Sequence, residues 1–229
     1  EPACRRGRVE EVTGAPQPND GHGIHLAATR TIQIGEDFVD TFVDLPFNFI
    51  GTNLGHGIFL ESCRDVTIRS TEIGRVHLNT FQPPAVDLPN AQSGIVLQNS
   101  SDCVIGSSWW HARVQVTGHL NGTGIHISGT GSHDNTVIGT FIGCEYFPGF
   151  NTIVGNTDLG NLVGIELVNG AWGNRIGMRG RGRNGTGASP MNYVHFNRTA
   201  GVIIDSGLDP SQSVPDGDEP FVPVGGNVV

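Results

Sequence analysis

Apolar and polar positions alternate in one short phrase that recurs along most of the chain. The phrase is a glycine followed by an aliphatic residue, a variable residue and a second aliphatic residue. Because successive side chains of a β-strand point to opposite faces, the two aliphatic residues share one face and the variable residue lies on the other. Each copy therefore predicts a short strand. The six copies begin at Gly23, Gly57, Gly94, Gly124, Gly164 and Gly201, which are 34, 37, 30, 40 and 37 residues apart.

Two further apolar stretches follow within most repeats. One comes after a polar turn, as in 65–68 and 135–139, and the other leads into the next glycine, as in 48–51. Three short strands per repeat make one coil. A coil cannot bury its inward side chains alone, so the coils must stack about 4.8 Å apart. The first aliphatic residues then form one interior ladder, which comprises Ile24, Ile58, Ile95, Ile125, Ile165 and Val202.

With these repeats the chain resembles the right-handed parallel β-helix proteins, the pectin-lyase-like group with loose "G-I-x-L … N-x-I-G" repeats, over about residues 20 to 207. We therefore predict an all-β fold, a right-handed parallel β-helix solenoid of about six coils. A left-handed β-helix, whose strict hexapeptide period is missing, and an antiparallel sandwich are the alternatives. The predicted organisation is an extended arm over residues 1–22, the β-helix over 23–207 and an extended segment over 208–229.

Composition narrows the functional classes. The formal net charge is −9 and the chain contains no lysine, which argues against a nucleic-acid partner because phosphate binding needs a concentrated basic face. The four cysteines lie far apart and form no CxxC pair, so buried free thiols are expected, with disulfides as the alternative. No apolar run approaches the roughly 20 residues of a membrane span.

Two outward positions on neighbouring coils offer acid and base chemistry. His126 and Glu166 occupy the variable position of the fourth and fifth copies, so their Cα atoms should lie about 5 Å apart. That separation suits a catalytic acid and base pair, and it equally suits an exposed hydrogen bond without a catalytic role. These two residues are the candidate catalytic residues.

The densest group of side chains suited to carbohydrate follows the second strand of the third coil. Trp109, Trp110, His111 and Arg113 lie within five residues of one another. Aromatic faces stack on sugar rings, and arginine pairs with acidic groups. We predict that these four residues bind carbohydrate at a corner of the solenoid, and the alternative is that one tryptophan belongs to the core.

Other chemistry is poorly supported. Nucleophile elbow, P-loop, dinucleotide-binding and HExxH motifs are absent, so no cofactor is expected. The acidic stretch Asp216-Gly217-Asp218-Glu219 carries oxygen ligands of the type that Ca²⁺ takes, and an exposed turn is the alternative.

Resemblance to β-helix proteins implies several functions, because the fold occurs in polysaccharide lyases, glycoside hydrolases, epimerases, phage tailspikes and adhesins. We expect an extracellular, cell-surface or virion-associated module that recognises a polysaccharide or surface glycan and assembles as a homotrimer. The second hypothesis is a polysaccharide-active enzyme, a lyase, hydrolase or epimerase, and the third is a structural spacer without a groove.

Overall fold

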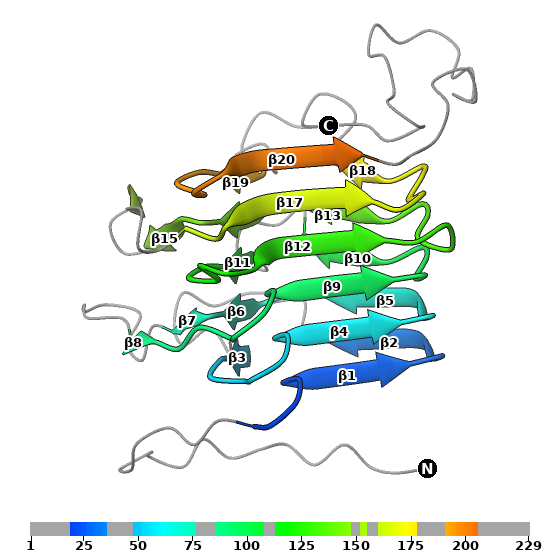
Figure 1. The fold of residues 1–229 in the computed structure, drawn as a ribbon, viewed down its shortest axis with the longest axis horizontal. Helices are drawn as coiled ribbons and strands as arrows, with labels where there is room; N and C mark the ends of the chain where they lie inside the picture. Colours follow the sequence, from blue (N-terminus) through cyan, green and yellow to red (C-terminus); the bar gives the residue numbers. More distant parts are fainter. Residues whose placement is uncertain are drawn as a thin grey trace, which may run out of the picture.

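The chain forms a stack of β-coils in the computed structural model (Figure 1). The structure describes residues 19–35, 48–76, 86–107, 113–147, 152–154, 160–177 and 191–205. Within these ranges all regular elements are β-strands, and no helix is long and apolar enough to cross a membrane. The predicted terminal segments, residues 1–18 and 206–229, lie outside the described residues.

The six copies of the glycine phrase form one six-stranded parallel sheet, here called sheet A. Neighbouring strands come from successive coils, so the sheet follows the order of the repeats. Its strands are β1 (Ile24–Ala27), β4 (Ile58–Glu61), β9 (Ile95–Gln98), β12 (Thr123–Ser128), β17 (Val163–Val168) and β20 (Ala200–Asp205).

Two five-stranded parallel sheets complete the coils. Sheet B follows sheet A along the chain and contains β2 (Arg30–Ile34), β5 (Arg64–Ile68), β10 (Val104–Gly106), β13 (Thr136–Ile138) and β18 (Arg175–Ile176). Sheet C leads back to sheet A and contains β3 (Asn48–Ile50), β6 (Thr71–Ile73), β11 (Val114–Val116), β14 (Thr140–Ile142) and β19 (Tyr193–Val194).

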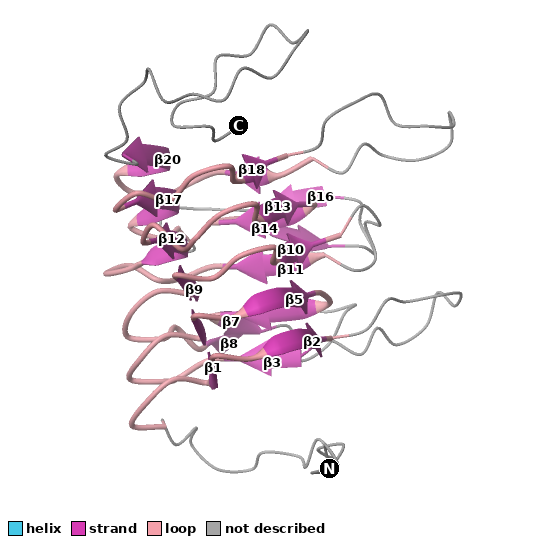
Figure 2. Cartoon of the chain, turned by 90° about the vertical axis from the view of Figure 1, so that its right-hand side faces the viewer, coloured by secondary structure: helices cyan, strands magenta, loops and turns pink. Residues whose placement is uncertain are grey.

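The path of the chain is that of a parallel β-helix, as the repeats predict. In Figure 1 the chain runs from left to right along sheet A at the front, returns behind it through sheets B and C, and rises by one coil, which is a right-handed path. Figure 2 shows sheet A as a separate wall opposite sheets B and C. Two antiparallel hairpins, β7 (Arg75–Val76) with β8 (Val86–Asp87) and β15 (Glu145–Phe147) with β16 (Thr152–Val154), follow sheet C strands.

The predicted interior ladder is confirmed. Each first aliphatic residue of the phrase pairs in register with its equivalent on the next coil, from Ile24 to Val202. In the four middle coils these side chains are fully buried, and the second aliphatic position forms a parallel ladder beside them. Stacking thus removes from water the apolar faces that single coils would expose.

Glycine opens the phrase because the space beside it is already occupied. A Cβ atom at Gly57 would lie 2.6 Å from Ile73 Cγ2 and 2.7 Å from the Gly94 carbonyl oxygen. At Gly124 it would lie 2.8 Å from Asn161 Nδ2. These glycines are therefore required by the packing of sheet A against the preceding corner.

Corner residues adopt the left-handed backbone that tight turns require. Ser62, Asn99 and Asn169, which follow sheet A strands, have φ values of 53°, 50° and 55°. Asp65 and Asp102 occupy a second left-handed position one turn later, with φ values of 56° and 55°. Short polar side chains tolerate this conformation through local hydrogen bonds, which explains their recurrence at the corners.

A hydrogen-bonded ladder of polar side chains runs through the corner that precedes sheet A. Each amide donates to the next coil, as Asn53 Nδ2 does to Asn90 Oδ1 at 2.6 Å. His119 replaces asparagine in the fourth coil, with Nε2 3.0 Å from Asn90 Nδ2 and Nδ1 3.0 Å from Asn161 Oδ1. The ladder comprises Asn19, Asn53, Asn90, His119, Asn161 and Asn197.

The direction of the ladder fixes the tautomer of His119. Asn90 Oδ1 already accepts from Asn53, so the Asn90 amide group donates to His119 Nε2. Nδ1 must then carry the proton that is donated to Asn161. Burial lowers the pKa of His119 to about 4, and the Asn161 hydrogen bond only partly opposes this effect.

The three described cysteines, Cys63, Cys103 and Cys144, are buried, and Cys63 and Cys103 are free thiols. Burial raises the pKa of Cys103 to about 11. A protonated thiol is a poor nucleophile, so Cys103 does not supply a reactive thiolate at neutral pH.

Candidate functional site

The outer face of sheet A carries the predicted acid and base pair and a group of aromatic rings. Outward side chains form three columns along the solenoid. The residues of the first column precede the glycine of each phrase. Those of the second column occupy its variable position, and those of the third column follow its second aliphatic residue. They contain His22, His56, Ser93, Thr123, Val163 and Ala200; His25, Phe59, Val96, His126, Glu166 and Ile203; and Ala27, Glu61, Gln98, Ser128, Val168 and Asp205.

His126 and Glu166 are in register on β12 and β17, as the repeat spacing predicts. His126 Nδ1 lies 2.8 Å from Glu166 Oε2, and the two side chains are 26% and 25% exposed. Thr123 Oγ1 also donates to Glu166 Oε2, at 3.3 Å. The carboxylate is thus held by two donors and in turn orients the imidazole.

This arrangement sets the chemistry of the imidazole. An ionised Glu166 can only accept hydrogen bonds, so it places the proton of neutral His126 on Nδ1. The Nε2 lone pair then remains as a base or a hydrogen-bond acceptor. A carboxylate that orients a partly exposed histidine is a recurrent arrangement for general acid and base catalysis.

Two histidines of the first column are held by backbone groups of the next coil. The His56 N–H donates to His22 Nδ1 at 2.9 Å, and the Ser93 N–H donates to His56 Nδ1 at 3.1 Å. The imidazole rings are parallel within 2°, with centroids 5.0 Å apart. Because Nδ1 accepts in both rings, the neutral forms carry their proton on Nε2.

The pKa values of these histidines agree with that geometry. Burial and the neighbouring His25 lower the pKa of His22. Burial, His22 and His126 together lower the pKa of His56 to about 4. At neutral pH both rings are therefore uncharged Nε2–H donors.

His25 and Phe59 extend the pair of histidines into a cluster of four rings. Their centroids are 4.9 Å apart, and Phe59 also lies 4.9 Å from the ring of His22 and 5.6 Å from that of His56. His25 Nε2 lies 3.5 Å from Glu61 Oε2, and both side chains are substantially exposed. The first two coils therefore present a partly exposed aromatic surface with a carboxylate at its edge.

The predicted carbohydrate-binding segment is only partly described. Trp109, Trp110 and His111 lie outside the described residues. Arg113 precedes β11 and is 2% exposed. Its guanidinium is therefore inside the protein, whereas reading an acidic sugar from solvent would require an exposed group. The acidic stretch Asp216–Glu219 also lies outside the described residues.

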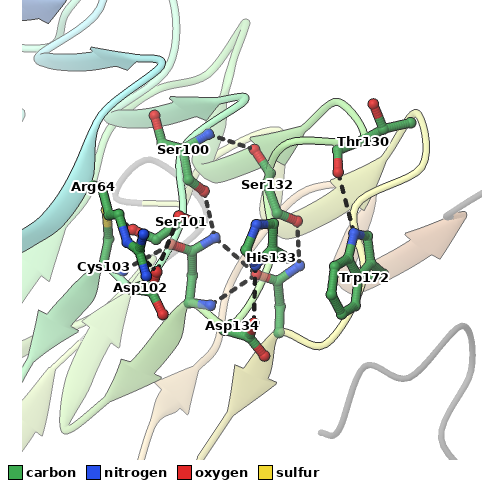
Figure 3. A network of polar contacts seen from close by, with 12 residues as sticks. Arg64, Ser100, Ser101, Asp102, Cys103, Thr130, Ser132, His133, Asp134 and Trp172 are labelled. Atoms are coloured by element: carbon green, nitrogen blue, oxygen red, sulfur yellow. Dashed lines mark hydrogen bonds and ion pairs between the residues drawn. The ribbon is translucent and has the colours of Figure 1, made fainter. Parts of the chain in front are cut away.

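A second polar network lies at the corner between sheets A and B (Figure 3). The ring of His133 stacks on Trp172 with centroids 4.7 Å apart, and the Trp172 indole N–H donates to the Thr130 carbonyl at 3.1 Å. His133 Nδ1 lies 2.9 Å from Asp134 Oδ2. Trp172 is 38% exposed, so the indole ring is accessible to solvent at this corner.

Serine and asparagine side chains support this corner from inside. Asn135 Nδ2 donates to Asn174 Oδ1 at 2.8 Å, and Asn174 Nδ2 donates to the Ser132 carbonyl at 3.0 Å. On neighbouring coils Arg64 Nε pairs with Asp102 Oδ2 at 2.9 Å. The network is a fixed scaffold for exposed side chains, similar in construction to the asparagine ladder on the opposite side of sheet A.

Sequence reasoning did not identify His22, His56 and Trp172 as candidates. The two histidines precede the phrase by one residue, a position that alternation alone does not assign to either face. Their signal is the recurrence of His-Gly in His22-Gly23 and His56-Gly57, which places two rings one coil apart. Trp172 lies between the strands of sheets A and B, at an isolated β-bridge to His133, where no periodic pattern marks it.

Comparison with known proteins returns no match: no family model, curated protein or solved structure is similar enough to the chain to indicate a family. Among the described residues, no three His, Cys, Asp or Glu side chains come together in a group that could hold a metal ion. The chemistry of the outer face of sheet A is therefore the basis for assigning a function.

Proposed function

We propose that this β-helix is a carbohydrate-recognition module that binds a glycan along the outer face of sheet A, in an extracellular, cell-surface or virion setting. The carrying observation is the cluster of four rings, His22, His25, His56 and Phe59, on one partly exposed face. Aromatic faces stack on sugar rings, while imidazole N–H groups and carboxylates bind hydroxyl groups. Kinship with the pectin-lyase-like group and a trimeric assembly belong to the same proposal.

The geometry of a β-helix also favours an extended ligand. Successive coils repeat similar positions along the axis, so the outer columns extend across six strands. A polymer lying along them can meet several coils at once, and repeat proteins commonly bind on such extended surfaces. The ring cluster occupies the first two coils, and His126 with Glu166 lies further along the same face.

Binding experiments with matched variants test this proposal. A glycan array followed by calorimetry would compare the wild type with His25→Ala/Phe59→Ala. Loss of two ring contacts should weaken binding about tenfold or more. Thr67→Ala, at an outward position of sheet B, is the control. The proposal fails if no glycan binds, or if the sheet A variant and the control bind equally well.

The 2.8 Å contact between His126 and Glu166 favours a second candidate function, a polysaccharide-active enzyme. In that case His126 Nε2 takes or gives the reacting proton, and Glu166 stabilises the imidazolium that forms. Assays of ultraviolet absorbance and reducing ends on a polysaccharide panel would detect elimination and hydrolysis. Turnover that Glu166→Gln abolishes without loss of binding would establish this alternative.

A further inference from the structure

In the part of the chain that the structure describes, the strands of sheet A carry outward carboxylates but no arginine or lysine. The six strands contain no arginine, and the whole chain contains no lysine. Glu61, Glu166 and Asp205 lie at outward positions of these strands. The described arginines lie outside these six strands, and Arg64, on β5 of sheet B, pairs with Asp102.

His22 and His56 do not offset this charge at neutral pH. His22 and His56 each accept a backbone N–H on Nδ1, so a second ring proton would cost that hydrogen bond. They therefore serve as uncharged donors through Nε2. His25 and His126 each lie beside a carboxylate, which a protonated ring would at most neutralise.

From this arrangement we infer that the glycan bound by sheet A is neutral and rich in hydroxyl groups, and that polyuronates and sulfated glycans are excluded. The inference rests on the proposed function and names the ligand class for the same face. A uronate or sulfate group on these columns would approach Glu61 or Glu166 within one or two coils, about 5–10 Å. Like charges at that distance repel each other. A bound glycan also covers the surface between its acidic group and the carboxylate, so water and salt screen this repulsion less.

A neutral sugar meets complementary groups instead. Its hydroxyl groups can donate to the Glu61 and Glu166 carboxylates and accept from the Nε2–H groups of His22 and His56. The apolar face of a pyranose can stack on Phe59. Each of these four polar side chains then has a partner that carries no net charge. If the protein is an enzyme, the same like-charge repulsion excludes lyases that act on uronates and favours enzymes that act on neutral glycans.

Matched polymer pairs that differ in charge test the ligand class. We would measure binding at pH 7.5 and low ionic strength to polygalacturonate and its fully methyl-esterified form, carboxymethylcellulose and hydroxyethylcellulose, and dextran sulfate and dextran. For a backbone that binds, the neutral member should bind about tenfold or more tightly than the acidic member, since like-charge contacts discriminate strongly. The difference should shrink in 0.5 M salt, because ions screen partly exposed charges.

Variants that remove one carboxylate test whether the outer face of sheet A causes the weaker binding of the acidic polymers. Glu61→Gln should reduce the difference in affinity between the neutral and acidic polymers several-fold. Asp65→Asn, which removes the same charge at an exposed position of β5 in sheet B, should leave the difference in affinity unchanged. Tighter binding of the acidic member, or equal effects of the two variants, would overturn the inference while carbohydrate recognition still stood. Absence of binding to any polymer, including the array glycans, would overturn both the inference and the proposed function.

Discussion

The inner and outer faces of sheet A differ in composition although they alternate along the same six strands. On the inner face each column repeats nearly one residue type, and Ile58, Ile95, Ile125 and Ile165 stack without exposure. On the outer face the neighbouring column changes from imidazole to phenyl, aliphatic and carboxylate groups. Packing constrains the inner side chains, because each must fit identical neighbours above and below. The outer side chains are released from that constraint and can differ from coil to coil.

This difference separates the residues that specify the fold from those that carry chemistry. A substitution on the inner face changes the packing against the coils above and below it, whereas most substitutions on the outer face change a single contact. Stability measurements on adjacent residues of a strand therefore test the comparison directly, and the expected effects fall from the interior to the exposed face.

The largest effect is expected for Ile125→Asp, which places a carboxylate between Ile95 and Ile165. An unpaired buried charge costs more than a marginally stable domain can lose, so the variant should not fold. Circular dichroism and limited proteolysis would detect the loss. Gln98→Asp, at an exposed outward position of β9, should fold normally. A folded Ile125→Asp protein would show that the ladder does not determine the fold.

A smaller effect is expected from acid acting on the asparagine ladder. The pKa of His119 is lowered from 6.5 to about 4 by burial, so below pH 6.5 the unfolded chain binds more protons than the folded one. The free energy of unfolding should therefore fall as the pH drops from about 6.5 to about 4. For this group the loss is about 3 kcal/mol.

Urea unfolding at several pH values would measure that loss. His56, whose pKa is also lowered, contributes to the pH dependence as well, so the informative quantity is the difference between the wild type and His119→Asn. This variant places in the fourth coil the residue that the other coils use, and its stability should depend less on pH. Equal pH dependence of the two proteins would contradict the role assigned to His119.

Gly124→Ala should destabilise the protein by about 1–3 kcal/mol, the usual cost of overpacking. Its Cβ would lie 2.7 Å from the Gly164 carbonyl oxygen and 2.8 Å from Asn161 Nδ2. Gly201→Ala is the matched control, because the nearest atom at this position is 3.7 Å away. Thermal unfolding of both variants would measure the difference. Equal stabilities would mean that the phrase retains glycine for a reason other than space.

Much of the fold could be predicted because the repeat records the inner ladder directly. The alternation in Gly-Ile-x-Leu determines which side chains share a face, and the recurrence of the phrase determines which strands are neighbours. The asparagine ladder was not predicted as such. Asn53, Asn90 and Asn161 occupy turns, and a turn residue can point inward or outward without a change in the pattern.

The candidate site was predicted less completely for a related reason. His126 and Glu166 were placed correctly because both occupy the variable position of the phrase. The partners of His22 and His56 are backbone N–H groups of the next coil, which leave no mark in the sequence. Arg113 was expected at the surface from its neighbours in sequence, but it is buried beside β11. Local sequence shows the type of a side chain and does not show what the next coil places over it.

The smallest effect on stability is expected for Glu166→Gln, and it sharpens the comparison because Ile165 precedes Glu166 on the same strand. The Glu166 side chain is partly exposed, and the amide oxygen of glutamine can still accept the proton of His126 Nδ1. The free energy of unfolding should therefore change by less than about 1 kcal/mol. Ile165→Ala removes a fully buried side chain and should cost about 2–5 kcal/mol. Urea unfolding of the two variants at pH 7 would measure both values, and the dependence of the free energy of unfolding on urea concentration should not change. A Glu166→Gln cost as large as that of Ile165→Ala would mean that the pair stabilises the fold, and the outer face would then share the structural role of the inner one.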